Sequence, residues 1–217
     1  MQKKMLSTLT LTELWGELKS YADGIKVNDS KKILNELSRL IQQHKGNKET
    51  CDELITKLLR IPVWLLRNKV TKPSIILIAL HRNSPKELVE ELSLTYGEKF
   101  ASSIELLRKK DYESNTKEER ASLRLEDFKN AVEKSKEAAL ILLAEHSVNR
   151  IDFTKEEDDD KKILWSIKNQ PRVEILHNFF LKNFKTEQNI VLSIKDTTTI
   201  LIEDLACMKG VLQLVKD

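Results

Sequence analysis

The chain has 217 residues, of which 40% are hydrophobic and 33% are charged, and it contains only 5 Gly and 4 Pro. Because Gly and Pro supply most sharp turns, this composition argues against a many-stranded sandwich or barrel and favours helices with charged outer faces. Its 2 Cys, Cys51 and Cys207, lie far apart and near no His, which excludes both a zinc-finger pattern and a disulfide framework.

Apolar residues recur at helical spacing from the beginning of the chain. Thr10 and Glu13 form a capping-box pattern before the first apolar stripe, and two further stripes follow before residue 60. We expect the third of these helices to end before Pro62, because the residue before a proline disfavours helical backbone. A short helical turn is expected over residues 62–69.

Residues 74–82 are apolar on every side at their centre. They could form a buried strand, but Pro73 at the first helical position and the helical neighbours favour a central, buried helix. Ser84, followed by Pro85 and Glu87, has the pattern of a capping box and predicts the start of the next helix.

A polar segment at 109–117 is the predicted boundary or hinge. Beyond it, Thr116 and Glu119 are expected to cap a single long helix that extends to about Asn149. Its inward positions alternate spacings of four and three and comprise Ala121, Leu125, Phe128, Val132, Ser135, Ala139, Leu142 and His146. This heptad seam predicts packing along a partner helix, either within the chain or in a homodimer.

The last part of the chain changes character. The acidic run at 156–160 is interpreted as a solvated helix start, because adjacent carboxylates diverge and do not converge on a metal ion. One helix is expected after it and another from near Pro171. The tail, residues 189–217, is rich in β-forming residues and predicts two or three short strands around one helix.

The predicted fold is therefore all-α, a multi-helix bundle with one long heptad-patterned helix, and it allows a small β-containing C-terminal piece. Three parts are expected: a basic helical bundle over 1–110, the long helix and later helices over 111–188, and the tail over 189–217. The longest apolar run, Ile75 to Leu80, is too short to cross a membrane. We expect an intracellular protein, cytoplasmic or nuclear, without a cofactor or a metal.

Positive charge is concentrated in the first half. Residues 1–110 carry 20 Lys or Arg against 13 Asp or Glu, and no acidic residue occurs from Leu54 to Lys86. The candidate binding residues of this basic segment, about 57–86, are Arg60, Arg67, Lys69, Lys72, Arg82 and Lys86. Such residues neutralise phosphates, and an exposed aromatic such as Trp64 could stack on a base. The alternative is a mainly buried segment with a solvated basic rim, and its apolar neighbours favour Trp64 as a core residue.

The sequence Arg172-Val-Glu-Ile-Leu-His177 is similar to the R-x4-6-H signature of HEPN-domain ribonucleases. This resemblance implies a metal-independent ribonuclease acting as a dimer, with His177 as acid or base and Arg172 on the scissile phosphate. The alternative is an amphipathic helix with both residues at its polar border.

The hypothesis that these patterns favour is a non-catalytic helical subunit or adaptor that associates with other macromolecules. Its basic segment would bind an acidic partner, with nucleic acid as the first candidate and an acidic protein surface as the second. A protein partner or a second copy would pack on the long helix. The ribonuclease is the alternative function.

Overall fold

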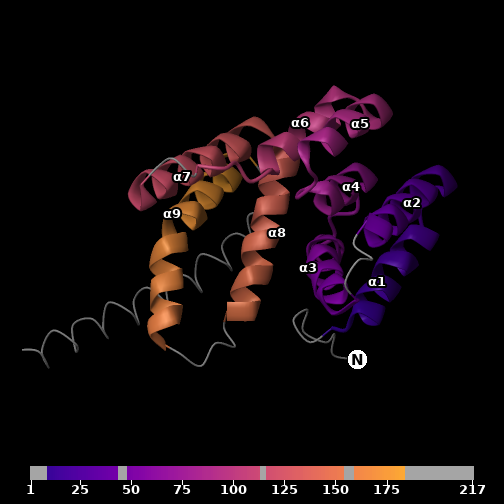
Figure 1. The fold of residues 1–217 in the computed structure, drawn as a ribbon, viewed down its shortest axis with the longest axis horizontal. Coiled ribbons are helices and arrows are strands. Elements are labelled where there is room, and N and C mark those ends of the chain that lie inside the picture. Colours follow the sequence, from indigo (N-terminus) through magenta and orange to yellow (C-terminus); the bar gives the residue numbers. More distant parts are fainter. Residues whose placement is uncertain (1–8, 44–47, 113–115, 154–158, 184–217) are drawn as a thin grey trace, which may run out of the picture. The chain divides into compact units, whose positions relative to one another are not determined.

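The computed structural model describes residues 9–43, 48–112, 116–153 and 159–183. Within these residues every regular element is a helix, which confirms the predicted all-α bundle class. The helices of the described part are α1 (Leu11–Asp23), α2 (Val27–Gln43), α3 (Lys48–Arg67), α4 (Pro73–His81), α5 (Lys86–Tyr96), α6 (Glu98–Leu107), α7 (Lys117–Lys134), α8 (Lys136–Phe153) and α9 (Asp159–Asn183) (Figure 1). The predicted β-containing tail, 189–217, lies outside the described residues.

The chain divides into two compact units. The first comprises Met1–Asp111 and Lys134–Ile151, and the second comprises Tyr112–Glu133 and Asp152–Asp217. The first unit therefore holds α1 to α6 together with most of α8, whereas most of α7 and all of α9 belong to the second. The chain passes from the first unit to the second after residue 111 and returns to the first for most of α8. The domain bounds expected from the sequence stay a prediction.

Helix α4 is the centre of the first unit. All its residues from Ile75 to His81 are buried, and α2, α3 and α6 each contact it. Figure 1 shows α4 among these neighbours. A helix that is apolar on all sides must be covered on all sides, and the packing around α4 meets this requirement. Pro73 occupies the first turn of α4, where its missing N–H costs no hydrogen bond.

Capping boxes begin two of the helices, as the sequence predicted. At α1, the Thr10 N–H donates to Glu13 Oε2 at 2.9 Å, and the Glu13 N–H donates to Thr10 Oγ1 at 3.3 Å. At α7 the same exchange joins Thr116 and Glu119, at 2.8 and 3.2 Å. Each box satisfies two N–H groups that have no partner inside the helix.

The prediction that helices stop at internal prolines is wrong. Helix α3 runs through Pro62, and α9 runs through Pro171. A proline inside a helix loses a hydrogen bond and clashes with the preceding turn, at a cost of about 3 kcal/mol or more. In α3 the neighbouring Ile61, Val63 and Leu65 are all buried. Burial of that many apolar side chains offsets the cost of the proline, so tertiary packing overrides the local signal.

The single long helix predicted over 116–149 is two helices, because α7 and α8 separate at Ser135. Ser135 is buried and caps α8: its Oγ accepts a hydrogen bond from the Ala138 N–H at 3.1 Å, and its carbonyl accepts from the Ala139 N–H at 2.9 Å. The seam is also unequally buried, since Ala121 is exposed whereas Val132 is fully buried. A homodimer through this seam stays a prediction.

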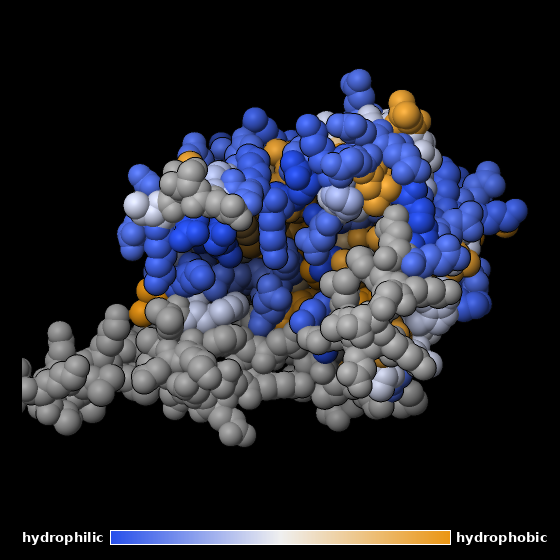
Figure 2. All heavy atoms as spheres, in the orientation of Figure 1, coloured by the Kyte–Doolittle hydropathy of each residue, from blue (hydrophilic) through white to orange (hydrophobic). Residues whose placement is uncertain are grey.

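Hydrophilic side chains cover most of the face shown in Figure 2. None of the helices in the described ranges combines the length and the apolar character that a membrane crossing needs.

Replacing Ser135 with Ala should lower the free energy of unfolding by about 1 kcal/mol, because the first turn of α8 loses its side-chain acceptor. Urea unfolding followed by circular dichroism measures this change. Ser122→Ala, at an exposed position of α7, is the matched control and should shift stability by less than about 0.5 kcal/mol. Equal effects of the two substitutions would contradict the capping role of Ser135.

Candidate functional site

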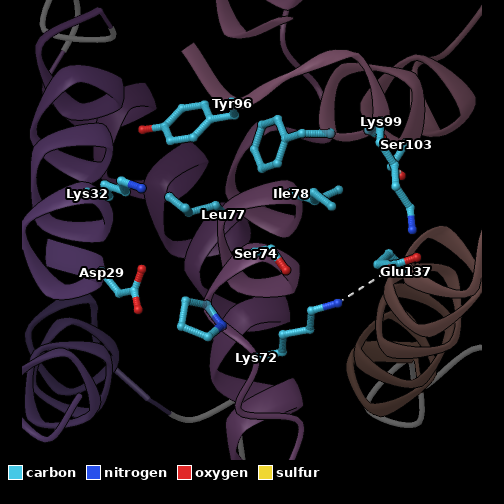
Figure 3. Close-up of a pocket in the computed structure, with 12 residues that line it drawn as sticks. Asp29, Lys32, Lys72, Ser74, Leu77, Ile78, Tyr96, Lys99, Ser103 and Glu137 are labelled. Carbon is cyan, nitrogen blue, oxygen red and sulfur yellow. Dashed lines mark hydrogen bonds and ion pairs between the residues drawn. The ribbon is translucent and has the colours of Figure 1, made fainter. Parts of the chain in front are cut away.

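A cavity of about 270 Å³ opens beside the first turns of α4. Its apolar lining comes from Pro73, Leu77 and Ile78 of α4 and from Phe100 of α6. The last three of these side chains are buried, so they are fixed by the packing of the first unit. Figure 3 shows the cavity with the polar residues that surround it.

Three lysines from separate parts of the chain line this cavity. Lys32 comes from α2, Lys72 immediately precedes α4, and Lys99 comes from α6. All three are exposed, and in Figure 3 their side chains lie around one space. We call the feature the lysine-rimmed cavity. The folding of α2 and α6 against α4 brings these charges together, since they are far apart in sequence.

Two carboxylates share the lining, Asp29 from α2 and Glu137 from the first turn of α8. Lys72 Nζ lies 3.4 Å from Glu137 Oε1, a long contact in which the lysine side chain is 63% exposed. Burial raises the pKa of Glu137, but its own backbone N–H and the charges of Lys72 and Lys99 outweigh burial, so the pKa lies below its usual value. Glu137 is therefore an ionised carboxylate that already neutralises part of the positive charge of the lysines.

The beginning of α4 adds to the positive potential of the cavity. A helix N-terminus carries a partial positive charge, and the first turn of α4 contains no acidic residue to neutralise it. Ser74 of this turn also lines the cavity. The arrangement favours an anionic group next to an apolar one.

Two arginines of the predicted basic segment make their contacts within the fold. Arg82 is 5% exposed, and its Nη1 donates to the Ala79 carbonyl at 2.9 Å. Burial lowers the pKa of Arg82, with the charge of Glu145 acting in the opposite direction. Arg67 pairs with Glu17, where Nε donates to Oε2 at 2.9 Å and Nη2 contacts Oε1. Neither guanidinium is presented as an open contact for a polyanion.

The remaining residues of the basic segment are dispersed. Arg60 is half-buried, whereas Lys69 and Lys86 are exposed but are not among the residues that line the cavity. Of the six predicted residues, only Lys72 belongs to the lysine-rimmed cavity. Trp64 is buried, as its apolar neighbours predicted, so it cannot stack on a base.

The residues of the predicted ribonuclease pair both lie on α9. The Arg172 guanidinium carbon lies 5.5 Å from the centre of the Phe128 ring, and its Nη1 contacts Asn169 Oδ1 at 3.4 Å. His177 is buried. Residues five apart on an α-helix are separated by about 140° around its axis. Arg172 and His177 therefore leave α9 in different directions. The signature itself places its Arg and His five to seven residues apart, so the ribonuclease stays a prediction.

A second polar cluster lies at the other end of α4, around Glu36. His81 Nδ1 lies 3.2 Å from Ser84 Oγ, and His81 Nε2 lies 3.2 Å from Glu36 Oε2. The Tyr96 hydroxyl donates to Glu36 Oε1 at 3.0 Å, and Arg39 Nε lies 3.2 Å from Oε2. Burial together with this hydrogen bond raises the pKa of Tyr96 to about 12, so the hydroxyl keeps its proton and remains a donor.

The order Ser84, His81, Glu36 has the composition of a catalytic triad, but its burial indicates a structural role. His81 is fully buried and Ser84 is 5% exposed, so a substrate could not reach the serine oxygen. The cluster instead joins α2, α4 and α5 through polar contacts inside the core. It also explains why Ser84 does not cap α5, which begins at Lys86 after Pro85 without a side-chain cap: the serine hydroxyl faces the histidine.

Sequence reasoning missed Lys32 and Lys99. Lys32 follows Lys31 on one amphipathic helix, and Lys99 follows Glu98 on another, so no local pattern distinguishes either from any solvated lysine. Among the described residues, no group of three His, Cys, Asp or Glu side chains could hold a metal ion. No protein-family model, curated protein or solved structure matches this chain. The evidence for its function therefore comes from the cavity and its lining residues.

Glu36→Gln should lower the free energy of unfolding by about 1–3 kcal/mol at pH 7, because the amide offers one acceptor oxygen where the carboxylate offers two and lacks the charge that faces His81 and Arg39. The contact with His81 lowers the pKa of Glu36 most, burial opposes it, and Tyr96 and Arg39 lower the pKa further. The folded pKa thus lies below the ordinary 4.5. The ionised carboxylate stabilises the fold above that value, and this stabilisation is lost as the pH falls through the folded pKa.

The difference in stability between wild type and Glu36→Gln should therefore shrink in acid. Urea unfolding at a series of pH values from 7 to about 3 measures it. Glu90→Gln, at an exposed position of α5, is the control and should leave stability nearly unchanged. If the variant lost the same stability at every pH, the cause would be a packing defect and not the loss of the carboxylate charge.

Proposed function

We propose that this protein is a non-catalytic helical binding module, an adaptor or a subunit of a complex, that holds an acidic partner at the lysine-rimmed cavity. The observation that carries the proposal is the convergence of Lys32, Lys72 and Lys99 from three segments on one cavity with an apolar lining. This geometry suits binding. Among the described residues of the site, no nucleophile is paired with a group that could take its proton.

The geometry favours an acidic polypeptide over nucleic acid as the partner. A single-strand nucleic-acid surface combines a continuous basic groove with exposed aromatic rings. Here Trp64 is buried, Arg82 is buried, and Arg67 pairs with Glu17. Three accessible lysines, Lys32, Lys72 and Lys99, surround one small cavity. The buried Leu77 and Phe100 in its lining suit contact with protein side chains.

Binding of this kind should be weak and sensitive to salt. Contacts of exposed lysines with carboxylates each contribute about 0.2–1 kcal/mol, and they are screened over about 10 Å at 0.1 M salt. A partner that makes several such contacts together would bind by their sum, in the manner of transient signalling and assembly contacts.

Reversing two lysines of the rim should reduce binding of an acidic polypeptide. We expect Lys72→Glu combined with Lys99→Glu to weaken binding of fluorescent polyglutamate by about ten-fold or more, because two attractions become repulsions. Fluorescence anisotropy measures the affinity from 25 to 300 mM NaCl. The wild-type affinity should fall with salt, and the salt dependence of the variant should be shallower.

The matched control reverses two other lysines, Lys69 and Lys86, which are exposed members of the basic segment outside the cavity lining. This control should change the affinity for polyglutamate far less. Single-stranded DNA, used as a second probe, distinguishes an acidic polypeptide at the cavity from nucleic acid on the basic segment. If DNA binds more tightly than polyglutamate and both double variants weaken it alike, the partner is nucleic acid on the basic segment, and the proposal of an acidic polypeptide at the cavity is wrong.

A further inference from the structure

We infer that the cavity accepts one apolar side chain of an acidic segment of a partner protein, and that Glu137 holds the rim lysines until that segment displaces it. This inference rests on the proposed function and adds two features to it. The first is an apolar anchor in the partner, and the second is an internal competitor in this chain.

The size and lining of the cavity argue for the anchor. About 270 Å³ is slightly below the roughly 300–1,000 Å³ of pockets that bury small molecules, and it suits a single large side chain. Leu77, Ile78 and Phe100 are already fixed in the core and leave an apolar wall exposed to this space. An apolar side chain that enters such a preformed pocket removes its surface from water without reordering the protein.

The positions of the lysines argue for acidic residues on both sides of the anchor. Lys32 lies on α2 at one side of the cavity, whereas Lys72 and Lys99 lie across it, as Figure 3 shows. A short segment with its anchor between them would place neighbouring Asp or Glu side chains beside these amines. Lys32 Nζ also lies 6.0 Å from the centre of the Tyr96 ring, which keeps this amine at the edge of the cavity.

The position of Glu137 argues for competition. In Figure 3 the side chains of both Lys72 and Lys99 reach toward its carboxylate, which is where a carboxylate of the partner would have to lie. The first turn of α8 holds Glu137 in place, and α8 is capped by Ser135, whose Oγ lies 3.2 Å from Ser103 Oγ of α6. The contact with Lys72 spans 3.4 Å, and the Lys72 side chain is 63% exposed whereas that of Glu137 is 17% exposed. The mobile partner is therefore Lys72, whose exposed amine can exchange Glu137 for a carboxylate of the partner at little cost.

Two peptides of seven residues test the anchor, one with Leu and one with Ala at the centre of six Glu. Nuclear magnetic resonance titration of the full chain with each peptide gives the affinity and shows which amides shift. The Leu peptide should bind about ten-fold more tightly than the Ala peptide and should shift the amides of Ser74 and Leu77. Ser74→Phe fills the cavity and should abolish this preference, whereas Ser102→Phe, at an exposed position of the same unit, should keep it.

Glu137→Gln tests the competition. It should strengthen binding of the Leu peptide by several-fold, whereas Glu90→Gln, which removes the same charge from an exposed position outside the cavity, should change it far less. The peptide pair needs no substitution in the protein, and Glu137→Gln keeps the size of the side chain, so these two tests decide the question even if Ser74→Phe does not fold.

Equal affinities of the two peptides, or equal effects of Glu137→Gln and Glu90→Gln, would overturn the inference. If Lys72→Glu with Lys99→Glu then still weakens both peptides, the inference alone fails and the proposed function stands. If neither peptide binds in a manner that depends on salt and on these lysines, the proposed function fails as well.

Discussion

Burial of α4 on every side is the constraint on which the first unit depends. Its residues from Ile75 to His81 leave no polar stripe for solvent, so the helix is stable only inside a shell of other helices. Helices α2, α3 and α6 supply that shell, and the same demand for apolar cover keeps α3 helical through Pro62. The polar features of the first unit lie where this covering ends, at the two ends of α4.

The two ends of α4 differ in their surroundings: a buried polar cluster lies at one end and an open cavity at the other. At its C-terminal end, His81 lies in the core with Ser84 and Glu36 beside its two ring nitrogens, because a buried polar group without partners is costly. The Tyr96 hydroxyl donates in turn to Glu36. At its N-terminal end, the covering helices leave a cavity that opens between lysines. Tyr96 belongs to both features, since its hydroxyl donates to Glu36 and its ring lines the cavity. Packing around the buried cluster therefore also positions one wall of the cavity.

In the binding module that we propose, different residues would serve stability and recognition. The apolar wall of the cavity is part of the core and is fixed before any partner arrives, which avoids the cost of ordering it on binding. The charges that would meet the partner are lysines on the outside, where exchange of one carboxylate for another changes the fold little. Glu137 lies between these layers, because the capped start of α8 holds its backbone while its side chain contacts an exposed amine.

The sequence by itself determined the helical class, the capping boxes at Thr10 and Thr116, and the central helix after Pro73, because these depend on local spacing and on hydrogen bonds within one turn. It could not determine where the helices end. Burial decides whether a helix continues through Pro62, and it decides whether Ser135 faces outward or caps a new helix. The candidate site was beyond its reach for the same reason. Lys72 was found in a run of basic residues, but Lys32 and Lys99 join it only when α2 and α6 pack on α4, and the burial of Arg82 comes from that same packing.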